Sequence, residues 1–453
     1  MSAVTAATLA ACGPDLTRAT LSPFIGVTAA PSMESTASPA QPTSSAAPSP
    51  TLSPSAASKR TLYRDAALAD GRSADLQRGV SVLVEGGTIS WIRPSDAEED
   101  PGPADRLEII DASGATIVPG MVDCHSHLTL PGGAHWIDRA LDPTDRLLAH
   151  AEHNARLMRQ AGVYWARDVG SPMRVDPVDG LERGLAIGLR ERWRGRREYP
   201  YVRASGTWVT RRGSLPSGLS VEADNGDQLL ALAMRQLDDG ADFVKLYLDG
   251  PDAGVAPWSV DEVKAVVDAA AVRNRKVTAH SGTLAGARVG VTAGVHSLEH
   301  GFQLDADVCR EMAARGAFLV STLAVMQSWL SFGQTTTISR FASAEGRASI
   351  NARLETARAS VRFALDAGVT ICAGTDFGGG SLRANQMAWE VESLVAAGLN
   401  PWQALGAATW RGGEVLGEPE AGSIRDGGPA DFFLVHGDPY SDPASLWRVW
   451  RTA

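Results

Sequence analysis

The sequence of 453 residues lacks several features that define other classes of protein. It has only four cysteines, Cys12, Cys124, Cys309 and Cys372, and no two of them are close together in the chain. This spacing argues against a disulfide framework or a zinc ribbon, and most of the cysteines are interpreted as small buried apolar residues. The sequence also has no run of about 18 apolar residues, so it predicts no membrane-spanning helix.

Clustered positive charge is scarce as well. The formal net charge is -10, whereas a nucleic-acid partner would require a basic surface that contacts phosphates. The one basic run, RERWRGRR at residues 190–197, is short and is interpreted as a solvated helix end. We therefore expect a small-molecule substrate and no nucleic-acid partner. A homo-oligomer is compatible with the sequence.

Residues 1–59 are rich in Ala, Ser, Thr and Pro, and we expect them to form a disordered tail because they can bury little apolar surface. TLAACG around Cys12 resembles the lipobox of bacterial lipoproteins, in which the cysteine is lipidated and a polar stretch tethers the domain. The preceding residues lack the basic start and apolar centre of a secretory signal. An exported lipoprotein anchored at Cys12 and a cytoplasmic protein with an accidental match both stay open. Mass spectrometry of the mature amino terminus distinguishes them.

From residue 60 onward the sequence has regular strand and helix patterns. VSVLVEGGTISWI, residues 80–92, predicts a hairpin with a glycine turn. Downstream, apolar strand segments alternate with amphipathic helical stretches, which is typical of βαβ units and a parallel sheet. The predicted strands lie at residues 117–127, 163–170, 201–206, 242–250, 276–282, 295–301, 317–322 and 369–378. The preceding helices often end at a glycine, such as Gly316 or Gly368.

These patterns predict an α/β fold with two structural units. Residues 117–416 are expected to form a (β/α)8 TIM-type barrel. Strand-like patterning returns at GSIRDGGPADFFLVHGDP, residues 422–439. Residues 60–116 and 417–453 are therefore expected to form a small β-sandwich domain built from both ends of the chain.

Residue types that bind metals occur at the carboxyl ends of the predicted strands, where barrel enzymes place their catalytic groups. His125 and His127 are two residues apart on one strand, so their side chains point to the same face and can hold one cation together. Two buried imidazoles need polar partners. A purely structural role for this pair is the alternative.

Three further residues close other predicted strands. His280 ends KVTAH and His300 ends VHSLEH; each alone is more typical of a core or rim histidine, but together with the HSH pair they indicate a metal site. His296 lies nearby and is interpreted as structural, because His300 is at the strand terminus. Asp376 ends the last strand, where a carboxylate can bind a cation and move a proton; a plain turn aspartate is the alternative.

Lys245 lies within the otherwise apolar segment DFVKLYLDG. An unpaired ammonium group is costly in such a strand. Carboxylation by carbon dioxide would convert the amine to an anionic carbamate that can bridge two cations. A buried salt bridge is the alternative.

The ordered segments PGMVDCHSH, FVKLYLDG, TAHSG, SLEHG and AGTDFG resemble the successive metal motifs of the amidohydrolase superfamily. They are most similar to the branch of imidazolonepropionases and metal-dependent dipeptidases, and the resemblance covers roughly residues 60 to 450. The segments ASGATIVPG, NPWQALGAATWRGGEVLG and GSIRDGGPADFFLVHGDP are also similar to that superfamily.

This resemblance implies a binuclear metal-dependent hydrolase. His125, His127 and Asp376 would hold one divalent cation and His280 and His300 the other, with zinc the usual metal. Carboxylated Lys245 and a hydroxide would bridge the two cations. The reaction implied is cleavage of an amide-type C–N bond in a peptide, N-acyl amino acid or cyclic amide, in which Asp376 passes the proton to the leaving nitrogen.

The sequence departs from the related Xaa-Pro dipeptidases at one informative place. Those enzymes carry a tyrosine shortly after the histidine of the fifth strand, whereas His280 is followed by Ser281, Gly282 and Thr283. This difference puts dipeptidase activity in doubt. Tyr247 shares a strand face with Lys245 and either points into the pocket or packs in the barrel.

Strand-end positions suggest further contacts to the substrate. Arg383 either clamps a substrate carboxylate or is an exposed arginine at a helix start. The candidates are Tyr247, Trp208, Arg211, Arg212, Thr322, Ser381 and Arg383.

Two other functions stay open. A mononuclear deaminase, or an ester or lactone hydrolase on the same barrel, would not require Lys245, and one metal ion per chain would favour it. A non-catalytic scaffold or binding protein on this fold would be expected to have lost metal ligands, yet all six ligand positions are filled.

Overall fold

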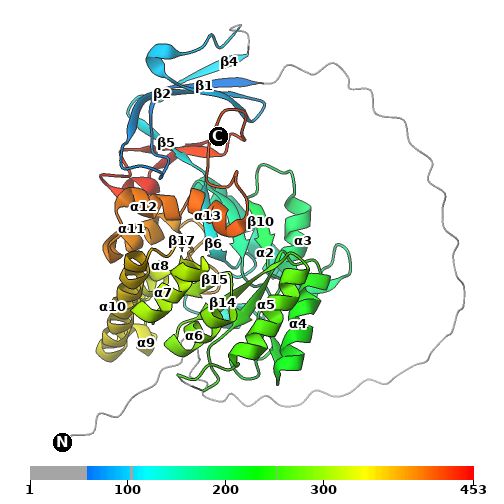
Figure 1. The fold of residues 1–453 in the computed structure, drawn as a ribbon. Helices are drawn as coiled ribbons and strands as arrows, with labels where there is room; N and C mark the ends of the chain where they lie inside the picture. The colour runs from blue at the N-terminus through cyan, green and yellow to red at the C-terminus, as the bar shows by residue number, and fades with distance from the viewer. Residues whose placement is uncertain (1–58, 103–105, 253) are drawn as a thin grey trace, which may run out of the picture. The chain divides into compact units, whose positions relative to one another are not determined.

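The computed structural model describes residues 59–102, 106–252 and 254–453 (Figure 1). The segment predicted to be a disordered tail, including Cys12, lies outside the described residues except for Lys59. Within the described ranges, none of the helices has the length and apolar character needed to cross a membrane.

A mixed sheet contains strands from both ends of the described chain (Figure 1). Its strand order is β19-β18-β5-β1-β2-β3, and β4 also pairs with β1. The predicted hairpin is present, because β2 and β3 pair antiparallel around the Gly86–Gly87 turn. The strands are β1 (Arg60–Leu68), β2 (Gln77–Glu85), β3 (Thr88–Pro94), β4 (Leu107–Asp111), β5 (Ala115–Pro119), β18 (Phe432–His436) and β19 (Val449–Thr452).

The remainder is an α/β arrangement with two parallel sheets. One has the order β10-β7-β6, and the other has the order β12-β11-β13-β14-β15-β16-β17. The strands are β6 (Met121–Ser126), β7 (Val163–Asp168), β10 (Tyr201–Ala204), β11 (Val209–Arg211), β12 (Val221–Ala223), β13 (Phe243–Tyr247), β14 (Lys276–Ser281), β15 (Ser297–His300), β16 (Phe318–Ser321) and β17 (Ile371–Ala373). A separate antiparallel pair is formed by β8 (Met173–Val175) and β9 (Glu182–Gly184).

All eight predicted βα segments contain a strand, namely β6, β7, β10 and β13 to β17. The first prediction was too long, because residues 117–127 form two strands rather than one. β5 pairs with β1 and β18, whereas β6 pairs with β7. Gly120 separates them, and a Cβ atom there would lie 2.5 Å from the Tyr164 ring. The chain therefore passes from the mixed sheet into the parallel sheet at a position with no room for a side chain.

The helices alternate with the parallel strands (Figure 1). The helix α5 begins with a capping box between Ser259 and Glu262, and α10 ends at Gly368 with a φ of 77°. The helices are α1 (Trp136–Arg139), α2 (Thr144–Gln160), α3 (Leu185–Trp193), α4 (Gly226–Asp238), α5 (Val260–Val272), α6 (Leu284–Ala293), α7 (Ala306–Arg315), α8 (Leu323–Phe332), α9 (Ser339–Ala342), α10 (Ala344–Ala367), α11 (Met387–Ala397), α12 (Pro401–Ala407) and α13 (Trp410–Leu416), with short 3-10 turns η1 (Ser95–Ala97) and η2 (Pro443–Trp447).

Backbone hydrogen bonds link the edges of the two parallel sheets. Beside β10, the amide of Asp242 donates to the carbonyl of Ala204 at 2.8 Å. Beside β6, the amide of Asp376 donates to the carbonyl of His125 at 2.8 Å, and the amide of His127 donates to Phe377 at 3.0 Å. These contacts bring the carboxyl end of the first parallel strand next to the segment that follows the last one.

Gly162, in the α/β part, packs against the mixed sheet. It follows α2 with a φ of 78°, and a Cβ atom there would lie 2.5 Å from the buried ring of Phe433 in β18. Gly316 follows α7 with a φ of 67°, but no atom lies within 4 Å of the corresponding Cβ position. The two glycines share a backbone conformation and differ in packing.

We predict that Gly162→Ala lowers the free energy of unfolding by about 2–5 kcal/mol, because it combines left-handed strain with overpacking. Gly316→Ala should cost only the strain, about 1–2 kcal/mol. Urea unfolding of both variants measures the difference. Equal losses would show that the Phe433 contact contributes nothing.

Candidate metal centre

The strand β6 directs His125 and His127 into the same site, as the two-residue spacing requires. Nδ1 of His125 lies 2.7 Å from Oε2 of Glu299, and Nδ1 of His127 lies 2.7 Å from the carbonyl of Gly170. The other ring nitrogens face Asp376, with Nε2 to Oδ1 distances of 3.5 Å and 3.3 Å. Each ring therefore has one nitrogen held by the protein and one directed at the carboxylate.

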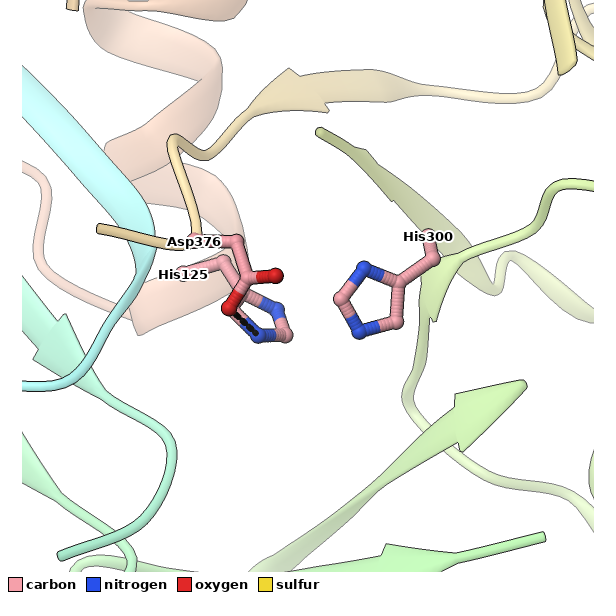
Figure 2. A group of neighbouring side chains, drawn as sticks. All are labelled: His125, His300 and Asp376. Carbon is pink, nitrogen blue, oxygen red and sulfur yellow. Dashed lines mark ion pairs between the residues drawn. The ribbon is translucent and has the colours of Figure 1, made fainter. Parts of the chain in front are cut away.

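His300 and Asp376 approach the same point from two other strand ends. The nearest nitrogen or oxygen atoms of His125, His300 and Asp376 all lie within 4.8 Å of one another (Figure 2). His300 has a φ of 69° and Asp376 a φ of 55°, a left-handed conformation that is uncommon for residues other than glycine. Such conformations cluster at functional sites, where the surrounding structure enforces them.

His280 extends this group along the neighbouring strand. Its ring lies 4.5 Å from the ring of His300, measured between centroids, and stacks on Tyr247 at 3.9 Å. Its Nε2 lies 3.1 Å from Oδ2 of Asp249. Tyr247 therefore orients the His280 ring at the site.

Lys245 is 1% exposed, and its Nζ has no hydrogen-bond partner among the residues that the structure describes. Burial lowers the pKa of the amine to about 8. The described residues also provide no salt bridge to it within 4.0 Å, so the alternative of a direct buried ion pair is not found there. An unsatisfied buried amine is costly, which indicates that another group completes its surroundings.

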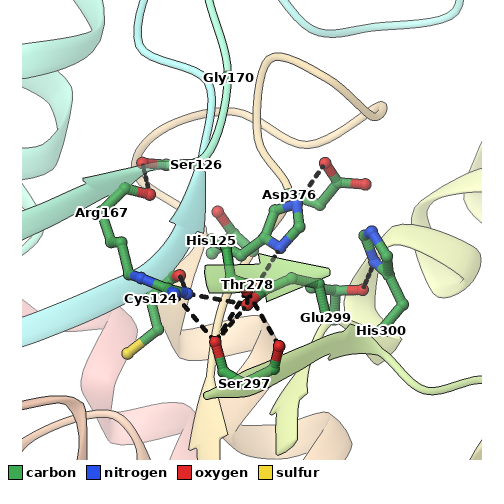
Figure 3. Close-up of polar contacts among 12 residues, drawn as sticks. Cys124, His125, Ser126, Arg167, Gly170, Thr278, Ser297, Glu299, His300 and Asp376 are labelled. Carbon is green, nitrogen blue, oxygen red and sulfur yellow. Dashed lines mark hydrogen bonds and ion pairs between the residues drawn. The ribbon is translucent and has the colours of Figure 1, made fainter. Parts of the chain in front are cut away.

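Glu299 was not identified from the sequence, although it lies within the SLEH motif. It is fully buried and accepts hydrogen bonds from Arg167 at 2.8 Å, Ser297 at 3.0 Å and the Thr278 hydroxyl (Figure 3). Burial raises the pKa of this carboxyl, but the charges of Arg167 and Lys245 and the bond to His125 hold it well below the ordinary value. Glu299 is therefore an anion that orients His125.

The predicted metal ligands line a cavity with an empty volume of about 670 Å³. Trp208 and Tyr247, both predicted as substrate contacts, also line it. Tyr247 lines the cavity and also packs in a buried apolar cluster with Trp208 and Leu219, so both positions considered from the sequence apply to it. The lining residues are His125, His127, Trp136, Trp208, Leu215, Leu219, Lys245, Tyr247, His280, His300, Phe302, Val325, Trp329, Arg353, Asp376, Gly379 and Gly380.

Several predicted contacts lie elsewhere. The guanidinium of Arg211 lies over the Trp258 ring at 5.1 Å, and exposed Arg212 pairs with Asp224 at 2.7 Å. Arg383 donates to the carbonyl of Pro131 at 2.7 Å. These arginines are absent from the cavity lining.

Two predicted hydroxyl contacts are also outside the lining. Thr322 is buried, with Oγ1 2.8 Å from Nδ1 of His300, so it orients that ring. Ser381 is hydrogen-bonded to Ser328. His296 also lies outside, with Nε2 3.2 Å from the Val415 carbonyl, consistent with the structural role expected for it.

The donor set is suited to divalent transition metals. Imidazole nitrogens and carboxylate oxygens are the ordinary ligands of zinc. Metal-binding histidines usually have the second ring nitrogen fixed by a carboxylate, carbonyl or hydroxyl, and His125, His127 and His300 all have such a partner. Burial lowers the pKa of His125 to about 3, which keeps its ring neutral and able to coordinate.

Comparison with known proteins agrees with this geometry. The model of the amidohydrolase family matches residues 116–451. The chain belongs to the amidohydrolase family. The match includes all six predicted metal ligands.

Relatives with named activities indicate which branch of the family this amidohydrolase resembles. An ochratoxinase of Aspergillus niger is 26% identical over an alignment of 381 residues that covers 74% of this chain and 74% of the relative. An imidazolonepropionase of Salinispora arenicola is 26% identical over an alignment of 408 residues that covers 83% of this chain and 90% of the relative. The structure of a Xaa-Pro dipeptidase with bound methionine is 26% identical with a TM-score of 0.72, covering 86% of this chain and 97% of the other. These likenesses confirm the predicted imidazolonepropionase-like branch.

The Arg167–Glu299 pair gives a test of the site's electrostatics, since the two side chains are 3% and 0% exposed. We predict that Arg167→Met lowers the free energy of unfolding by about 3–5 kcal/mol, because it leaves a buried carboxylate without its main partner. Chemical denaturation measures the loss.

Arg310→Met is the control, since its pair with Asp307 is exposed. It should change stability by less than about 1 kcal/mol. A similarly small effect of Arg167→Met would contradict the account of Glu299 as a buried anion.

Proposed function

We propose that this amidohydrolase is a binuclear metal-dependent hydrolase that cleaves an amide-type C–N bond in a small molecule. The observation that carries the proposal is the convergence of six ligand-type side chains on one cavity, with the Lys245 amine unsatisfied among the described residues. His125, His127 and Asp376 would hold one divalent cation, and His280 and His300 would hold the other. Zinc is the metal we expect.

Carboxylation of Lys245 would complete the centre. Its neutral amine would form an N–C bond to carbon dioxide and release one proton, giving an anionic carbamate that would be able to hold the cations. A pKa of about 8 leaves a fraction of this amine neutral at physiological pH. The reaction would replace an unsatisfied buried amine with a coordinated anion.

The bound cations would supply Lewis acidity that polarises the substrate carbonyl and lowers the pKa of water. Asp376 would take up a proton at its carboxylate and pass it to the leaving nitrogen. The cavity wall formed by Trp208, Leu219 and Phe302 would exclude bulk water from the reacting bond. Tyr247 would keep the His280 ring in its orientation.

The parallel strands form the framework of the proposed centre. We infer that the edge hydrogen bonds close β6, β7, β10 and β13 to β17 into a (β/α)8 barrel over residues 117–416. Residues 60–116 and 417–453 would form the small β-sandwich domain. Amidohydrolase relatives typically have such a barrel, and the ligands lie at the carboxyl ends of its strands.

A mononuclear centre is the second candidate. Atoms of His125, His300 and Asp376 alone are close enough to hold one ion. A deaminase or an ester or lactone hydrolase would need no bridging lysine. A metal stoichiometry near one per chain in the fully active enzyme would favour this candidate.

We predict that Lys245→Ala reduces the bound metal from about two ions per chain to one or fewer and lowers kcat by more than about 100-fold. The reason is the loss of the one protein ligand proposed to bridge both ions. His296→Ala is the matched control and should retain metal and turnover. Elemental analysis and kinetics of the two purified variants test this, and full metal content in Lys245→Ala would contradict the binuclear centre.

We also predict that a chelator abolishes hydrolysis and that added zinc or manganese restores it. Dipeptides, N-acyl amino acids, lactams and lactones form the substrate set. Activity that persists after elemental analysis shows the metal to be gone would overturn the proposed function.

A further inference from the structure

The cavity has an aromatic outer part that the metal chemistry does not use. Trp136 comes from α1, Trp329 from α8 and Phe302 from the segment after β15, and they line the cavity together with Trp208. Leu215 and Leu219 add further apolar surface. The flat rings favour a substrate with a planar apolar group, since aromatic rings stack on one another in offset or edge-on arrangements.

Besides the proposed metal ligands, one charged side chain lines the cavity. Arg353, on α10, lines the cavity, and its guanidinium lies 5.5 Å from the centroid of the Trp329 ring. The ring contact leaves the guanidinium edge, with its N–H donors, available for other partners.

Arg353 has no acidic partner among the described residues, as is also true of Arg347 and Arg362 on the same helix but not of Arg358. Arg358 pairs with Glu355 at 2.7 Å, whereas no described carboxylate lies within 4.0 Å of Arg353. Apart from Asp376, no acidic side chain of the described chain lines the cavity. A guanidinium among apolar groups can gain strongly by binding a carboxylate through two parallel N–H···O bonds.

We propose that Arg353 binds a carboxylate of the substrate, so that the natural substrates are amides that carry both a planar apolar group and a free carboxylate. This inference rests on the proposed amide hydrolysis and adds its substrate class. Arg353 takes the role that the sequence suggested for Arg383, whose guanidinium donates to the Pro131 carbonyl instead. N-acyl derivatives of aromatic amino acids have both features.

The kinetic test compares N-acetyl-L-phenylalanine with its neutral analogue N-acetyl-L-phenylalaninamide in the metal-loaded enzyme. Arg353→Met should raise KM for the acid about 10- to 100-fold, as expected for loss of a charged hydrogen bond. It should leave kcat and the kinetics of the amide nearly unchanged. Arg353→Lys should recover part of the affinity, and Arg358→Met, on the same helix and outside the cavity, should behave as the wild type.

A binding test separates this inference from the proposed chemistry. Quenching of tryptophan fluorescence by 3-phenylpropanoate and by neutral 3-phenylpropan-1-ol measures the carboxylate preference without any hydrolysis. The wild type should prefer the acid by at least about tenfold, and Arg353→Met should lose that preference. If neither amide is hydrolysed but this pattern holds, the proposed function fails and the carboxylate site stands.

Two results would overturn the carboxylate site. One is an acid preference that persists in Arg353→Met, which would mean that the carboxylate binds the cations. The other is the absence of any acid preference in the wild type. Either result leaves metal-dependent hydrolysis of neutral amides intact.

Discussion

The cost of burying charge is the constraint on which the centre of this molecule depends. Arg167 on β7, Lys245 on β13 and Glu299 on β15 are buried charged side chains. Asp376, which follows β17, lies close enough for its charge to act on Lys245. A single ion in that environment would be strongly destabilising. Arg167 and Glu299 form an ion pair, and Asp376 faces the two imidazoles of β6 and the residue after it. The Lys245 amine alone of these groups has no hydrogen-bond partner among the described residues. The Arg167–Glu299 pair thus stabilises the fold, whereas the Lys245 amine remains available for chemistry.

The parallel strands place the ligand-type side chains next to one another. Each of β6, β13, β14 and β15 contributes ligand-type residues, and the segment after β17 contributes Asp376. Residues far apart in the sequence converge because parallel strands end on the same side. The left-handed conformations of His300 and Asp376 then turn their side chains inward as the strands end. The backbone brings the histidines together, and hydrogen bonds from their rings to Glu299, Gly170 and Thr322 fix the ring orientations.

Sequence patterns predicted the strands well because these strands are buried on both faces and therefore appear as continuous apolar runs. The division at Gly120 was missed, since apolar residues continue on both sides of it and only the different pairing partners of β5 and β6 reveal the break. The motif residues were identified by type and position. Glu299 and Arg353 were missed for different reasons. Glu299 directly precedes His300, to which the motif assigns the metal, and Arg353 lies mid-helix with no local signal. Only tertiary packing brings Arg353 to the cavity.

The junction at Gly120 has a mechanical consequence. β5 is hydrogen-bonded into the mixed sheet, and β6 carries His125, so one residue separates the two without a flexible linker. Strain imposed on the mixed sheet, for example by adsorption to a solid support, would be transmitted directly to an imidazole of the centre. Immobilisation through helices far from that sheet, such as the exposed face of α7, would avoid this coupling.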